Sequence, residues 1–137
     1  MIRKFAQRHR QDLVDDSANS TPFDWTRWTF VETLRRTIFF VQIINVVSTR
    51  LQKQDPFFYE ALDDDLILEM PLPAAAPLWE ANQEQQWLSV RSKQPRKHLT
   101  GRMVRQDCTS IPNDADTFTM MVIGSLALDD LSSIPAL

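Results

Sequence analysis

The sequence predicts an all-α protein in which a long central buried helix is packed by two or three shorter helices with proline-marked loops. Only two glycines occur among the 137 residues, and tight hairpins of antiparallel sheets depend on glycine. The eight prolines lie between the candidate helices, where they act as breakers. Apolar residues recur at spacings of three and four in three stretches, which predicts helices near 24–54, 77–92 and 117–131. This length suits a single domain over residues 1–137.

The first predicted helix organises the chain. Asp24 can cap its N-terminus, and Asp55 stands before a proline and is therefore biased away from helical geometry. No glycine or proline interrupts the stretch between them. One face carries its regularly spaced apolar side chains, namely Trp25, Trp28, Val31, Leu34, Ile38, Val41, Ile44 and Val47.

The second half of this helix, from Ile38 to Val47, is apolar nearly all round. Gln42 and Asn45 are its only polar residues, so we expect other elements to cover it on several sides. A membrane span needs about 20 apolar residues. The apolar stretch is interrupted by charged residues before it reaches that length, at Arg35, Arg36 and Arg50. We therefore expect no membrane partner.

Glu32 precedes Arg35 by three residues and Arg36 by four, and both spacings bring side chains together on a helix surface. A solvated pair of this kind contributes about 0.3–0.5 kcal/mol. We expect instead a partly buried pair, because Trp28 and Leu34 place apolar side chains on either side of it.

The pattern Trp28-x-x-x-Glu32-x-x-Arg35-Arg36 in a long apolar helix resembles the signature helix of the fungal-specific transcription factor domain. This domain is the regulatory region downstream of a binuclear zinc-cluster DNA-binding domain. The resemblance spans about residues 23–90 and continues through Leu72-Pro73 and Leu78-Trp79-Glu80-Ala81 to Trp87. It implies a non-catalytic helical module that restrains the DNA-binding part and responds to small molecules or partner proteins. The implied role of the matching residues is to hold helix to helix: Trp28, Glu32, Arg35, Arg36, Trp79 and Trp87.

The zinc cluster itself has no counterpart in this sequence. Cys108 is the single cysteine, whereas that cluster needs six, and His9 and His98 are too far apart to show a zinc-ligand spacing. The net charge of −3 gives no general attraction for nucleic acid. We therefore expect no direct DNA binding, no metal and no cofactor, and an intracellular location in the nucleus or cytoplasm.

In the second predicted helix, Pro77 lies in the first turn, and Trp79 and Trp87 share one face that packs into the core. Asp116 or Thr117 caps the third helix, which is apolar on most sides and is therefore expected to be buried.

The remaining segments, 1–22 and 91–116, look linker-like, with a short amphipathic helix inside the first 16 residues. Asp63 to Asp65 are expected to form a solvated acidic turn rather than a metal site, because consecutive residues point in different directions.

A second functional hypothesis belongs to another class. Four tryptophans, eight phenylalanines and five methionines are enough to line a pocket for an apolar metabolite. The chain would then be a small protein of fungal secondary metabolism that binds such a molecule, or a cofactor-independent cyclase or isomerase that acts on it. Its polar contacts would be drawn from Glu32, Gln42, Asn45 and Tyr59.

The few short helices also leave the apolar second half of the central helix incompletely covered. Apolar patches of this kind usually become interfaces. We therefore expect a homodimer or a docked partner helix, with Phe39, Phe40 and Ile43 at the centre of the contact.

Overall fold

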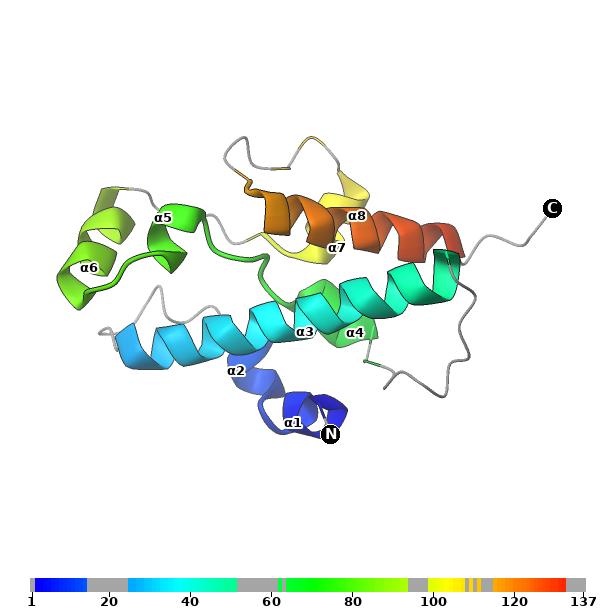
Figure 1. The fold of residues 1–137 in the computed structure, drawn as a ribbon, viewed down its shortest axis with the longest axis horizontal. Coiled ribbons are helices and arrows are strands. Elements are labelled where there is room, and N and C mark those ends of the chain that lie inside the picture. The colour runs from blue at the N-terminus through cyan, green and yellow to red at the C-terminus, as the bar shows by residue number, and fades with distance from the viewer. Residues whose placement is uncertain are drawn as a thin grey trace.

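The fold is all-α over the residues described by the structure, a computed structural model: 2–14, 25–51, 62, 64–93, 99–107, 109, 111 and 115–132. Within these residues the only β-type pairing is an isolated bridge between Pro71 and Thr100. The helices follow in the order α1 (Ile2–Arg8), α2 (Arg10–Val14), α3 (Trp25–Leu51), α4 (Asp64–Glu69), α5 (Ala76–Trp79), α6 (Glu84–Lys93), α7 (Gly101–Gln106) and α8 (Thr117–Ser132) (Figure 1). The predicted fold class is confirmed.

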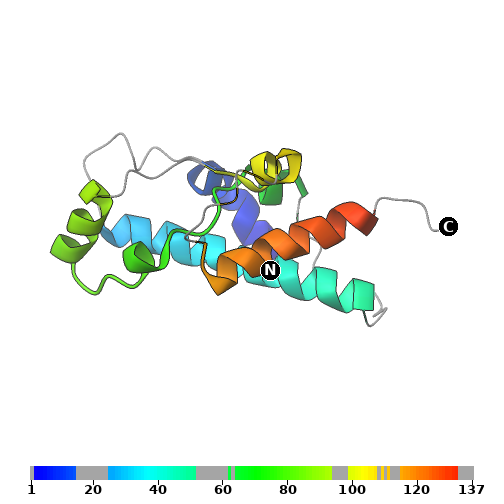
Figure 2. The same cartoon turned by 90° about the horizontal axis from the view of Figure 1, so that it is seen from above.

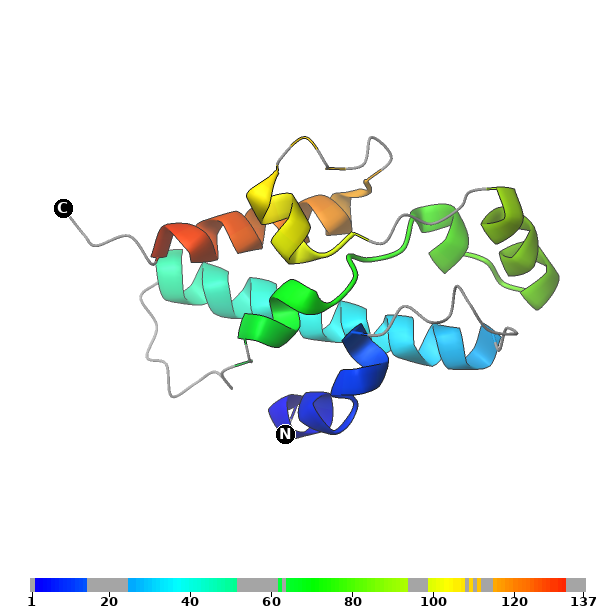
Figure 3. The same ribbon diagram turned by 180° about the vertical axis from the view of Figure 1, so that it is seen from behind.

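The long helix α3 forms the axis of the molecule. Helix α8 lies along its second half, and α5 and α6 lie near its first half (Figures 1 and 2). Viewed from behind, the short helices α2 and α4 lie in front of α3, and both contact it (Figure 3). No helix in the described part of the chain is both long and apolar enough to cross a membrane.

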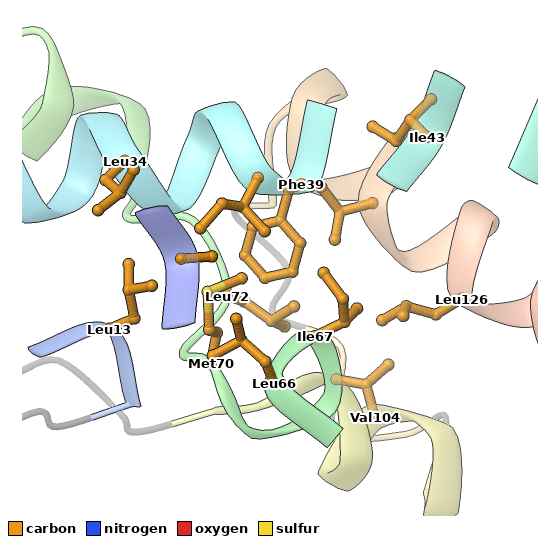
Figure 4. Close-up of a cluster of buried hydrophobic side chains, with 13 residues drawn as sticks. Leu13, Leu34, Phe39, Ile43, Leu66, Ile67, Met70, Leu72, Val104 and Leu126 are labelled. Atoms are coloured by element: carbon orange, nitrogen blue, oxygen red, sulfur yellow. The ribbon is translucent and has the colours of Figure 1, made fainter. Parts of the chain in front are cut away.

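The main core lies where α3, α4, α7 and α8 meet. Phe39 points from α3 into a group of side chains from the other three helices, among them Ile67, Val104 and Leu126 (Figure 4). Helix α7 can approach α8 closely because it starts with a glycine: a Cβ atom on Gly101 would lie 2.8 Å from Leu126 Cδ1.

The predicted helix near 77–92 is wrong in one respect, because the structure divides it into α5 and α6 with a break at residues 80–83. Pro77 does lie in the first turn of α5, as predicted. Trp79 and Trp87 therefore belong to different helices rather than to one face of a single helix. Both rings nevertheless lie next to Trp28, and the break is what lets each of them reach it.

Helix α8 begins where the sequence predicts. The Asp116 carboxylate accepts a hydrogen bond of 2.8 Å from the Thr119 N–H, which is the expected cap. The expectation that α8 is buried on most sides is wrong, because Met120 and Met121 are both about half exposed. Its buried face carries Val122 and Leu126, so α8 packs on one side only.

The faces of α3 also differ from expectation in its second half. Phe39 and Ile43 are buried, whereas Phe40 and Ile44 are exposed. Cover is therefore incomplete, but Phe39 and Ile43 cannot be at the centre of an exposed contact. The apolar run is continuous around the helix, so its sequence does not indicate which face the other helices cover.

The segments that look linker-like contain helices of their own. Residues 2–14 form α1 and α2, and residues 91–116 include the end of α6 and all of α7. The Thr100 hydroxyl caps α7 by accepting from the Met103 N–H at 3.3 Å. Asp64 and Asp65 are exposed in the first turn of α4, where the helix dipole favours acidic side chains. Asp63 lies outside the described residues.

Candidate functional site

The side chain of Glu32 is completely buried on α3. Its Oε2 atom accepts one hydrogen bond from the Ala74 backbone N–H at 3.0 Å and another from Arg36 Nε at 3.1 Å. Arg36 Nη2 in turn donates to the Ala74 carbonyl at 2.9 Å. Glu32 and Arg36, one helical turn apart, thus bind the backbone N–H and the backbone C=O of Ala74.

The sequence around Ala74 explains why these partners are needed. Pro71 and Pro73 keep the segment between α4 and α5 out of a helix, so its backbone cannot form helical hydrogen bonds. Ala74 is buried, and a buried backbone N–H or C=O without a partner is costly. The Leu72 N–H donates a hydrogen bond to the Leu99 carbonyl at 2.8 Å. Glu32 and Arg36 supply the corresponding partners at Ala74.

Arg35 connects the same carboxylate to a third segment. It is 3% exposed, and its Nε donates to the Leu13 carbonyl at 2.9 Å, with Nη2 3.4 Å from the Asp12 carbonyl. These carbonyls lie in the last turn of α2, where helical partners run out. Arg35 Nη1 lies 4.0 Å from Glu32 Oε1. The expectation of a partly buried Glu–Arg pair is therefore confirmed, with stronger burial than predicted.

A group of three indoles packs beside this polar contact. The ring of Trp28 lies 5.4 Å from Trp87 and 6.5 Å from Trp79, with both pairs tilted by about 50°. The Arg36 guanidinium lies 4.5 Å from the centre of the Trp79 ring and 5.3 Å from that of Phe118 on α8. Such cation–π contacts are favourable, more so when desolvated. Arg36 thereby contacts both α5 and α8.

We call Glu32, Arg35 and Arg36 the Glu32 cluster, and Trp28, Trp79 and Trp87 the tryptophan cluster. All six signature residues thus meet at one place, where α3 joins α2, the 71–75 segment, α5 and α6. In the Glu32 cluster the carboxylate and the Arg35 guanidinium are buried, and the Arg36 side chain is 14% exposed. Removing the carboxylate would leave one buried and one partly buried positive charge without a counter-charge, which is strongly unfavourable.

The other residues proposed as ligand or partner contacts do not join this site. Gln42 is buried and Asn45 is half-buried on α3, but Gln42 lies ten residues beyond Glu32, about 15 Å along the helix. Phe39 and Ile43 belong to the main core and Phe40 to the surface. Tyr59 lies outside the described residues.

Sequence reasoning missed the partners of the Glu32 cluster, because they are backbone atoms of Ala74, Leu13 and Asp12. An alanine or leucine side chain gives no indication that its peptide group is bound by a distant side chain. One indication was available at Ala74: a segment with prolines at 71 and 73 leaves the next N–H in need of a partner outside its own secondary structure.

Within the described ranges, no group of three or more His, Cys, Asp or Glu side chains is arranged to hold a metal ion. Comparison of the chain with protein-family models, curated proteins and solved structures found no match.

Proposed function

We propose that this chain is a non-catalytic regulatory module, of the kind that the resemblance to the fungal-specific transcription factor domain implies. In this proposal the Glu32 cluster keeps α5 and α6 fixed against α3. The module exerts its restraint on a DNA-binding part only while this arrangement is intact.

One observation supports this proposal above the others. Glu32 Oε2 accepts from the Ala74 N–H and from Arg36 Nε, whereas Oε1 makes no hydrogen bond among the described residues and faces Arg35 Nη1 at 4.0 Å. A carboxylate that served as an acid or base would have to reach a reacting group. Glu32 instead lies between helices, so its geometry suits a role in holding elements together.

A tethered reporter assay tests the proposal. The complete chain is inserted between a heterologous DNA-binding domain and an activation domain, and reporter output is compared with that of the fusion lacking the chain. We expect the native chain to lower the output. Arg36→Ala should restore it, because the hydrogen bond to the Ala74 carbonyl and the contact with Trp79 are both lost.

The matched control is Arg27→Ala, which removes an exposed arginine from the same helix. It should leave the restraint unchanged, and immunoblots should show equal amounts of all fusions. A native chain that does not alter reporter output contradicts the proposal. Equal effects of the two substitutions would show that the restraint of reporter output does not depend on the Glu32 cluster.

The alternative of a pocket for an apolar metabolite gains no support from this geometry. The polar groups that it needs are Glu32, Gln42, Asn45 and Tyr59. Glu32 is held by Arg36 and Ala74, and Gln42 lies about three helical turns away from it.

A further inference from the structure

An exposed stripe runs along α3 on the side away from the Glu32 cluster. It consists of Phe30, Thr33, Thr37, Phe40 and Ile44, and we call these residues the α3 stripe. Phe30, Phe40 and Ile44 are 51%, 53% and 40% exposed, so three large apolar side chains lie at the surface along this one face. Thr33 and Thr37 are exposed as well.

The two threonines make the α3 stripe more apolar than its composition indicates. The Thr33 hydroxyl donates to the Thr29 carbonyl at 2.7 Å, and the Thr37 hydroxyl donates to the Thr33 carbonyl at 2.8 Å. Both hydroxyl protons are therefore used within the helix. A molecule that covers this face need not replace those two bonds.

The α3 stripe is also free of charge. Its flanking positions on α3 are neutral as well: Thr26, Thr29, Val41, Val47 and Ser48. The nearest arginines point elsewhere, since Arg27 bonds Asp12 and Arg36 bonds Ala74. Like charges would not oppose the approach of an identical surface, and no charged partner is selected by this face.

The other elements of the described chain lie to the sides of this face. Helix α8 packs along α3 (Figure 1), and α2 and α4 contact α3 on the face seen from behind (Figure 3). At the N-terminal end of the α3 stripe, His9 contacts Phe30 edge-on with ring centres 5.9 Å apart. The rest of the Phe30 ring remains exposed.

The first four of the five residues in the α3 stripe are arranged symmetrically. Its spacings of three, four, three and four are those of the a and d positions of a coiled-coil seam. Reading from Phe30 to Phe40 gives Phe-Thr-Thr-Phe, with a centre at position 35. If two copies meet antiparallel about that centre, Phe30 faces Phe40 of the other copy, and Thr33 faces Thr37.

A two-fold dimer requires this kind of self-complementarity, because residue i must contact residue j while j contacts i. The small threonines at the centre permit close approach of the two helices, and the phenylalanines fill the space on either side. The side chains of an unrelated helix are not expected to complement this symmetric order. The pattern therefore favours a second copy of this chain as the occupant.

We propose that the α3 stripe is the interface of an antiparallel homodimer of this chain. The stripe is about 21 Å long from Phe30 to Ile44, which places the contact near the lower end of specific interfaces, at about 1,200 Å² or less in total. We expect a reversible dimer that dissociates at micromolar concentration. The Glu32 cluster takes no part in it, so this inference does not depend on the proposed function.

Sedimentation velocity over a concentration series tests whether the dimer forms. The native chain should shift from monomer to dimer, and Phe40→Glu should weaken association at least tenfold while leaving the circular dichroism spectrum unchanged. The matched control is Met121→Glu, which charges a similarly exposed apolar residue on α8. A native chain that stays monomeric at all concentrations overturns the proposal, as does loss of the dimer in Met121→Glu but not in Phe40→Glu.

Cysteine cross-linking tests the register without disturbing the phenylalanines. Two proteins, Thr33→Cys and Thr37→Cys, are made with Cys108 replaced by serine, and they are oxidised separately and as a mixture. The antiparallel register predicts that the mixed disulfide between position 33 of one copy and 37 of the other dominates. Predominance of 33–33 and 37–37 products would indicate a parallel pair and would overturn the proposed register.

Discussion

The two halves of α3 are held in place by different chemistry. In the first half, Glu32 and Arg36 bind the backbone of Ala74, and Trp28 packs between two other indoles. In the second half, Ile38 and Phe39 meet apolar side chains from the short helices and α8. The packing of the first half depends on specific hydrogen bonds and ring contacts. The packing of the second half depends on how fully its apolar side chains fill the core.

This difference determines how each half should respond to substitution. Removing a group from an apolar core costs roughly in proportion to the atoms lost and the cavity left behind. Changing one partner in a buried ionic contact leaves the others desolvated and unpaired, whatever the change in volume. A substitution that keeps the shape of the side chain separates the two cases.

The largest effect is expected for Glu32→Gln, which changes charge and hardly changes size. It leaves the buried Arg35 and the partly buried Arg36 without a counter-charge, so the free energy of unfolding should fall by about 3–5 kcal/mol. Urea unfolding followed by circular dichroism measures this change. Arg27→Gln, which breaks an exposed pair with Asp12, should cost at most about 0.5 kcal/mol. Equal costs for the two substitutions would show that burial of Glu32 has no energetic consequence.

A graded effect is expected in the second half, where the cost depends on how many atoms are removed. Ile38→Val removes one methylene group from a fully buried side chain and should lower the free energy of unfolding by about 0.5–1.5 kcal/mol. Ile38→Ala should cost more, about 2–5 kcal/mol, because a larger cavity remains. The same urea experiment measures both variants. If valine and alanine had the same effect, the graded packing attributed to this half would be wrong.

The sequence was sufficient to predict the elements that carry their own periodicity and caps. Helix α3 begins one residue after its predicted start, and α8 begins at the predicted residue, with Asp116 as its cap. The pairing of Glu32 with Arg36 was predictable for the same reason, since a spacing of four residues on a helix fixes the neighbour.

Features that depend on tertiary contacts could not be predicted. Residues 80–83 contain no glycine or proline, so local propensity favours one continuous helix, and the requirement that both Trp79 and Trp87 reach Trp28 overrides it. In the apolar half of α3, a step of one residue rotates a side chain by about 100°. That rotation separates buried Phe39 from exposed Phe40, and a uniformly apolar pattern does not distinguish the two.

The smallest effect is expected at Asp107, which is an exposed counterpart of Glu32. Like Glu32, it accepts from a side chain and from a backbone N–H: the Thr109 hydroxyl lies 2.6 Å from Asp107 Oδ1 and the Thr109 N–H lies 3.0 Å from it. The hydroxyl bond first, and then the backbone bond, lower the pKa of the Asp107 carboxyl below its usual 3.8. Because it is exposed, solvent screens these interactions and their contribution to stability is small.

The sign of the pH dependence follows from the lowered pKa. The native state holds the Asp107 proton less tightly than the unfolded chain, so this contribution is present above pH 3.8 and is lost as the pH falls through the lower native pKa. Thr109→Ala removes the hydroxyl bond and should raise the pKa of Asp107 toward 3.8. An NMR titration of the carboxyl carbon measures this shift, with Thr26→Ala, an exposed threonine on α3, as the control. If Asp107 titrates identically in both variants, the Thr109 hydroxyl does not set its pKa. The contrast with Glu32 then rests on burial alone.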